Sequence, residues 1–341
     1  MIIYKYRGGD KKVFERDLKS LEDNYFWASD ASKLNDPCET IVDTDSFKNG
    51  IRSIGNQMQL RNKKEAEASI DKVCEELDKL INHQIGIFSL SQTYIDELLW
   101  AHYANSHKGF CIGYNIDILT KNNSLNKFIP VSVDYSNTIP KVTHSDIQQI
   151  SNNLKNNNLI KKFAATKSRR WETEQEIRLI TNSPGRQDYD YRAVKSIYFG
   201  LRMSNKKKDK IMELLQGRGI KYFQIHLKDN TYEFFEKEVN DNYPTIKKYL
   251  YNISPVSGES VSENLVCQEY QKYIPFLHKA IEIARREPYC KFVYLADFKF
   301  SEIKHNKPEV FVNCEKTNND FPNYYYTLEE IDKLYSQIDD V

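Results

Sequence analysis

The chain of 341 residues contains only 12 glycines, and none of them belongs to a familiar phosphate-binding pattern. Neither G-x-G-x-x-G nor G-x-x-x-x-G-K occurs, which excludes a Rossmann pyrophosphate turn and a P-loop. The patterns G-x-S-x-G and H-E-x-x-H are also absent, so the common hydrolase and metalloprotease signatures are missing. The sequence therefore argues against classical dehydrogenases, nucleoside triphosphatases and zinc proteases.

Paired cysteines, long apolar runs and a net charge of one sign are lacking as well. The six cysteines, at positions 38, 74, 111, 267, 290 and 314, form no C-x-x-C pair and indicate reduced thiols. No apolar run approaches the roughly 20 residues that cross a bilayer. With 49 basic and 48 acidic residues the net charge is only +1, so nucleic acid could be attracted only by a local patch. We expect a cytoplasmic protein with no membrane partner.

Aromatic residues are plentiful, with 23 Tyr and 17 Phe in a chain that is 40% hydrophobic. This composition favours strands over a helical bundle and predicts an α+β fold. The length exceeds the usual limit of one core, which favours one large domain with a smaller one beside it. Since the residue composition changes at the Ser/Gly/Pro-rich segment 254–264, we expect a catalytic domain over 1–240 and an accessory helix-strand subdomain over 241–341.

Hydrophobic periodicity predicts the elements of both parts. In the first, strands are expected at 2–7, 25–29, 85–91, 109–114, 131–135, 174–180, 196–199, 222–226 and 232–235. Helices are expected after the turn at Gly8-Gly9-Asp10 and at about 56–83, 95–103 and 206–216. The polar stretch 141–160 suits a poorly capped helix or a connector. The second part should hold one helix over 266–284, kinked at Pro275, and one strand over 291–300.

Glu174 and Glu176 form the strongest local pattern, within Trp171 to Arg178. On a strand, this spacing places both carboxylates on one face. Two like charges so placed raise each other's pKa and suit an acid, a base or a stabiliser of a cation. The alternative interpretation is an exposed strand face whose charges form a ladder of ion pairs with Arg178. Spacing alone does not separate the two.

Arg7, immediately before two glycines at the end of the first expected strand, could present its planar fork to a phosphate or carboxylate. The alternative is an exposed charge on an edge strand.

The basic residues Lys161, Lys162, Lys167, Arg169 and Arg170 precede the paired glutamates and could draw an anionic substrate toward them, or form a solvated face.

The aromatic segment Trp100 to His107 is a further candidate. His102 and His107 are five residues apart and cannot share a helical face, which disfavours metal binding by this pair. Trp100 and Tyr103 suit either the core or stacking on a planar ligand.

Taken together, these motifs resemble a bacterial family of unknown function, the one numbered 2971. The shared blocks are Tyr4-Lys5-Tyr6-Arg7, Asn35-Asp36-Pro37-Cys38-Glu39, Ser89-Leu90-Ser91, Trp100 to Ala104, Lys108 to Gly113, Lys167 to Arg178 and Ile197-Tyr198-Phe199-Gly200. The resemblance covers about residues 2–235.

The order of an arginine on the first strand, a serine on a later strand and a Glu-x-Glu on a late strand also resembles R-S-E type ADP-ribosyltransferases. This resemblance implies a split β-sheet core with surrounding helices, and NAD as a substrate. Arg7 would hold the NAD phosphates or the nicotinamide ribose. Glu176 would bind the ribose 2′-hydroxyl and stabilise the cation formed as nicotinamide leaves, and Glu174 would orient or deprotonate the acceptor.

The other implied NAD contacts are Ser29 or Ser91 in the serine role, Asn35 of the N-D-P loop, and Trp100 or Tyr103 stacked on nicotinamide. The acceptor would be a macromolecule, with nucleic acid and protein both open, as for a toxin or an anti-phage effector. The C-terminal region could bind an antitoxin or a chaperone.

Two other functions fit the residues. Asp36, Glu39, Glu174 and Glu176 could gather Mg²⁺ in a nuclease. Alternatively, the chain could be a noncatalytic binding module.

Overall fold

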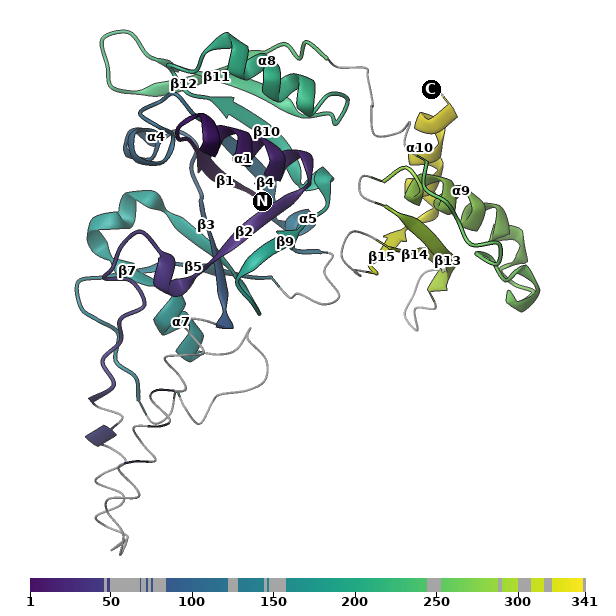
Figure 1. Ribbon diagram of the computed structural model, residues 1–341, viewed down its shortest axis with the longest axis horizontal. Helices are drawn as coiled ribbons and strands as arrows, with labels where there is room; N and C mark the ends of the chain where they lie inside the picture. The colour runs from purple at the N-terminus through teal and green to yellow at the C-terminus, as the bar shows by residue number, and fades with distance from the viewer. Residues whose placement is uncertain are drawn as a thin grey trace, which may run out of the picture. The chain divides into compact units, whose positions relative to one another are not determined.

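The computed structural model describes residues 1–45, 84–121, 128–143, 158–243, 253–287, 290–299, 308–315 and 321–339, together with 48, 49, 68, 72, 75 and 146. The chain divides into two compact units. Unit one comprises Met1–Thr120, Leu125–Lys210 and Ile220–Asn240, and unit two comprises Lys121–Ser124, Ile211–Gly219 and Asp241–Val341. Both are shown in Figure 1. The helix expected at about 56–83 lies almost wholly outside the described residues.

Unit one is built on a mixed sheet of ten described strands, which confirms the α+β class (Figure 1). Its main order is β12-β11-β10-β4-β1-β3-β2-β9, with β8 pairing with β3 and β5 pairing with β8. The strands are β1 (Ile2–Arg7), β2 (Tyr25–Asp30), β3 (Gly86–Ser91), β4 (Phe110–Asn115), β5 (Ile129–Ser132), β8 (Glu176–Thr181), β9 (Gly185–Asp188), β10 (Val194–Phe199), β11 (Lys221–Leu227) and β12 (Phe234–Val239).

Short helices connect these strands. They are α1 (Lys11–Glu22), α4 (Glu97–Tyr103), α5 (Ile116–Lys121), α7 (Asn158–Ala164) and α8 (Asn205–Leu214). Asp10 caps α1, since its side chain accepts a hydrogen bond from the Val13 amide, as the turn before it predicted. A two-stranded parallel sheet, β6 (Asp134–Ser136) with β7 (Thr166–Ser168), precedes the 3₁₀ helix η4 (Arg169–Glu174).

The central strands of unit one diverge. β1 pairs with β4 along its whole length, from Ile2 opposite Asn115 to Arg7 opposite Phe110. Against β3, however, it is paired only where Tyr4 lies opposite Ser91. β3 instead pairs with β8 over six positions, ending at Ser91 opposite Glu176. The sheet is therefore open between β1 and β3 beyond Tyr4.

One strand begins later than its sequence predicts. The expected strand at 174–180 starts at Glu176, because Glu174 ends η4 and Gln175 adopts a left-handed conformation with φ of 45°. The period-2 argument for a shared face was therefore wrong for Glu174. A left-handed residue between the two glutamates breaks the alternation of a strand.

Unit two has a three-stranded antiparallel sheet, β13 (Phe292–Lys299), β14 (Glu309–Glu315) and β15 (Asn323–Tyr326), with helices α9 (Ile274–Ala284) and α10 (Leu328–Asp339). The expected helix over 266–284 is shorter than predicted. Pro275 lies in the first turn of α9, where a missing amide costs nothing, so it starts the helix and does not kink it. The prediction of a single strand was also wrong, because β14 and β15 were missed.

Candidate functional site

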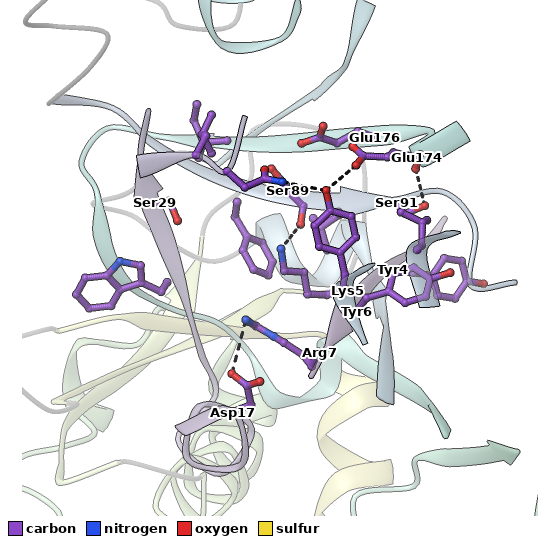
Figure 2. A pocket seen from close by; sticks show the side chains of 18 of the residues that line it. Tyr4, Lys5, Tyr6, Arg7, Asp17, Ser29, Ser89, Ser91, Glu174 and Glu176 are labelled. Carbon is purple, nitrogen blue, oxygen red and sulfur yellow. Dashed lines mark hydrogen bonds and ion pairs between the residues drawn. The ribbon is translucent and has the colours of Figure 1, made fainter. Parts of the chain in front are cut away.

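A cavity of about 550 Å³ opens in unit one where β1 and β3 diverge (Figure 2). Lys5 and Arg7 of β1 line one side of it, and Glu174 and Glu176 lie opposite. Of the eight site residues predicted from the sequence, seven line this cavity: Arg7, Ser29, Asn35, Ser91, Tyr103, Glu174 and Glu176. Residues about 170 positions apart thus meet in one place.

Trp100 is the predicted residue that does not line the cavity. Its side chain is fully buried, packs edge-to-face on Tyr6, and donates a hydrogen bond from Nε1 to the Tyr94 carbonyl. It therefore belongs to the core, and its assignment as a nicotinamide-stacking residue is corrected. An aromatic helix looks the same in sequence whether its face meets a ligand or the sheet behind it.

Five charged side chains form a buried ion cluster beside the cavity: Glu39, Lys167, Glu174, Glu176 and Arg178. Each residue is at most 6% exposed. Lys167 lies at the centre, with its Nζ 2.5 Å from Glu174 Oε2, 3.2 Å from Glu176 Oε2 and 3.4 Å from Glu39 Oε1. The exposed ladder of ion pairs considered from the sequence is therefore wrong.

Glu176 is held as a carboxylate. Burial opposes its ionisation, but the Arg178 guanidinium and the Lys167 ammonium outweigh burial and lower the pKa of Glu176 to about 2. Arg178 donates from Nε to Glu176 Oε1 at 2.8 Å, and its Nη2 also bonds Glu39. A carboxyl group so charged accepts hydrogen bonds and stabilises cations, but does not serve as an acid at neutral pH.

Glu174 reaches the same place from the end of η4. The Tyr103 hydroxyl donates to Glu174 Oε1 at 2.7 Å, and Asn35 Nδ2 donates to that hydroxyl at 3.2 Å. Burial, together with the bond to Glu174, raises the pKa of Tyr103. The structure thus shows a contact between the Tyr103 hydroxyl and a carboxylate, whereas the sequence suggested a role only for its ring.

The serines differ in what their hydroxyls contact. Ser91 Oγ donates to the Glu174 carbonyl at 2.7 Å and accepts from the Thr93 amide at 3.1 Å, so it fixes the backbone. Ser89, which the sequence analysis did not single out, lines the cavity, and its hydroxyl contributes to the lowered pKa of Glu176. Ser29 lines it from β2.

Arg7 lies on an inner strand, between β4 and β3, so its interpretation as an exposed edge charge was wrong. Its Nη1 is 3.8 Å from Asp17 Oδ1, and its buried Nε has no hydrogen-bond partner among the described residues. The next residue, Gly8, has no room for a side chain, because a Cβ there would lie 2.5 Å from the Ala104 carbonyl carbon. Only glycine lets β1 end against the turn after α4.

Sequence reasoning did not select Lys5 or Ser89 as site residues, it placed Arg178 only in an exposed ladder of ion pairs, and it misread Lys167. The alternation of β1 places Lys5 two residues before Arg7, which could have marked it. Lys167 belongs to the basic run that was expected to attract an anion. It instead neutralises the carboxylates, since its pKa, which burial lowers, is raised overall by Glu176, Glu39 and Glu174.

The carboxylates proposed for a metal-dependent nuclease do not enclose a vacant centre. Glu39, Glu174 and Glu176 converge on the Lys167 ammonium, and Asp36 accepts a hydrogen bond from Trp171 Nε1 at 2.8 Å. Within the described ranges, no group of three or more His, Cys, Asp or Glu side chains is arranged to hold a metal ion. This geometry gives the nuclease hypothesis no support.

The fold and the cavity define a mixed α/β protein with buried charges beside a cavity in its large mixed sheet. Residues 99–179 match the family described as Protein of unknown function (DUF2971), which confirms over that segment the family resemblance seen in the sequence. The matched segment contains Tyr103, Lys167, Glu174 and Glu176. No curated protein and no solved structure matches the chain. Among the described residues, no helix is long and apolar enough to span a bilayer.

Proposed function

We propose that the chain is an NAD-consuming ADP-ribosyltransferase. One observation carries this proposal: a single cavity has cationic side chains on the β1 side and carboxylates on the opposite side (Figure 2). NAD has the matching polarity, with an anionic diphosphate at its centre and a positively charged nicotinamide at one end. The opening between β1 and β3 also suits the split-sheet core of such enzymes.

The cationic side would hold the diphosphate. Arg7 is well placed for this role, because among the described residues its guanidinium contacts one carboxylate, and that contact is long at 3.8 Å. A planar fork with free N–H groups binds phosphate oxygens in pairs.

The ion cluster would stabilise the reacting sugar. Three carboxylates face two cations there, so its formal charge is −1. As the bond from ribose C1′ to nicotinamide breaks, nicotinamide leaves with the electron pair and positive charge develops on the sugar. Glu176, fixed by Arg178 and ionised at neutral pH, would accept a hydrogen bond from the 2′-hydroxyl and stabilise that charge.

Glu174 would act on the acceptor. Its two oxygens are held by Tyr103 and Lys167, which orients the carboxylate at the cavity. The acceptor nucleophile would form the new bond to C1′ and lose its proton with Glu174 as the orienting group or base. Ser29 or Ser91 would contact the nicotinamide ribose, and Asn35 would line the same end.

The biological role follows the same proposal. The acceptor is a macromolecule, either nucleic acid or protein, and the activity suits a toxin or an anti-phage effector. An antitoxin or a chaperone is the proposed partner of the C-terminal region.

Incubation of the full chain with nicotinamide-labelled NAD and total cell extract tests the proposal. We expect release of free nicotinamide, and Glu176→Gln should lower its rate by about a hundredfold or more. Glu172→Gln is the matched control, because Glu172 lies in the neighbouring η4 but is exposed. NAD left intact by the wild-type chain, or equal rates of nicotinamide release in the wild type and in a Glu176→Gln variant that remains folded, would contradict it.

A further inference from the structure

Lys5 lies inside the cavity, next to Arg7 along β1. Its Nζ donates a hydrogen bond to the Ser89 carbonyl at 2.7 Å and lies 5.0 Å from the centre of the Phe88 ring. The Arg7 guanidinium carbon lies 5.9 Å from the same ring. Two cations on alternate residues of one strand thus stand over one aromatic face, where both can reach a single ligand.

Neither cation is fully satisfied by the described protein groups. An ammonium has three N–H donors, and the structure shows one hydrogen bond for Lys5, to Ser89. The buried Nε of Arg7 has no partner at all among the described residues. Buried donors without partners are costly in a folded protein, so such groups point to a ligand that supplies acceptors.

We infer that Lys5 and Arg7 together form a binding site for a diphosphate diester, in which Lys5 supplies the second positive charge. Two cations match the two negative charges of such a group, and the Phe88 ring provides an apolar floor. This inference rests on the proposed function only for the choice of a diphosphate over other dianions. It adds Lys5 as a residue that determines which ligand the cavity accepts.

The Lys5 amine gains or loses its proton near neutral pH. Burial, with Arg7 beside it, lowers the pKa of Lys5 to about 7. The other groups that face Lys5 are Glu176 of β8, Asp17 of α1, Glu174 of η4 and Cys111 of β4. Of these, the carboxylates favour the charged amine, while burial raises the pKa of the Cys111 thiol and keeps it neutral.

The pH dependence of binding follows from this. Lys5 is charged below its pKa and neutral above it, so a dianion should bind more tightly as the pH falls through about 7. A diphosphate diester keeps both negative charges across this range. The pH dependence of binding therefore arises from titration of the protein and not of the ligand.

The test is calorimetric titration of the full chain with ADP-ribose, a diphosphate diester that lacks nicotinamide. Lys5→Met should weaken binding by about tenfold or more. Lys5→Arg should retain binding and lose the pH dependence, since arginine stays charged. Lys11→Met, at an exposed lysine of α1, is the control and should bind as the wild type does.

Unchanged affinity in Lys5→Met, an equal loss in Lys11→Met, or adenosine binding as tightly as ADP-ribose would overturn the inference. Its failure is separable from that of the proposed function. If the chain releases nicotinamide but Lys5→Met binds ADP-ribose as tightly as the wild type, only the inference is contradicted. Lys5-dependent binding of ADP-ribose by a chain that leaves NAD intact would support the inference and contradict only the transferase.

Discussion

Unit one and unit two bury different kinds of side chain. The described part of unit one buries seven charged residues, Asp17, Glu39, Asp146, Lys167, Glu174, Glu176 and Arg178. Among the described residues 253–339, by contrast, no charged side chain is buried. There the core consists of residues such as Leu277, Val310 and Tyr326. Since a buried ion pair rarely stabilises a fold more than apolar packing would, five charges gathered beside one cavity indicate a site.

Among the tests of this difference between the two units, Arg178→Met should have the largest effect on stability. The substitution leaves Glu39 and Glu176 buried without their guanidinium, so we expect unit one to lose about 4 kcal/mol of unfolding free energy. Hydrogen exchange should show the loss in β8, with β13 to β15 protected as before. Leu277→Ala is the converse control, because it leaves a cavity in unit two alone. A stable Arg178→Met variant would show that the cluster is not held by its pairing.

Acidification should distinguish the same two regions. The folded-state pKa of Glu176 is depressed from 4.5 to about 2, so its contribution is fully present above pH 4.5 and is lost as pH falls through about 2. That contribution is on the order of 3 kcal/mol. Denaturant unfolding of wild type and Glu176→Gln over this window measures it, and only the wild type should show this loss.

Unit two should respond less to acid. Its Glu282 also has a lowered pKa, because Arg286 and Arg285 outweigh burial, but its side chain is 32% exposed and solvent screens the pair. A larger acid-induced loss of protection in unit two than in unit one would contradict the comparison.

Tyr103→Phe gives the smallest expected effect. It removes the hydroxyl that donates to Glu174 and keeps the ring, so it should lower the unfolding free energy by about 1 kcal/mol. It also separates two roles of this residue. If the hydroxyl positions Glu174, the rate of nicotinamide release should fall in Tyr103→Phe, whereas a ring that only stacks on a ligand would leave that rate unchanged.

The sequence predicted the parts of unit one that depend on local pattern. β1, β3 and β10 follow from apolar and aromatic alternation, and the motifs around Arg7 and Glu176 identified residues that line the cavity. The convergence itself rested on a resemblance, because about 170 residues separate those motifs. The left-handed Gln175, which decides where Glu174 points, has no local signal that a strand pattern reveals.

Other features could not be predicted because they depend on tertiary contacts. Lys167 looks like any member of a basic run until three carboxylates from different segments surround it. Trp100 belongs to an aromatic helix whose buried face is set by the sheet behind it. In unit two, Pro275 was read as a break, whereas its position in the first turn of α9 was decided by where the chain turns before it.

The most direct test of the central claim is a crystal structure of the full chain with ADP-ribose. The account predicts the diphosphate on Lys5 and Arg7, and the C1′ end of the terminal ribose beside Glu176. A ligand bound outside the cavity, or a diphosphate that contacts neither cation, would contradict the account.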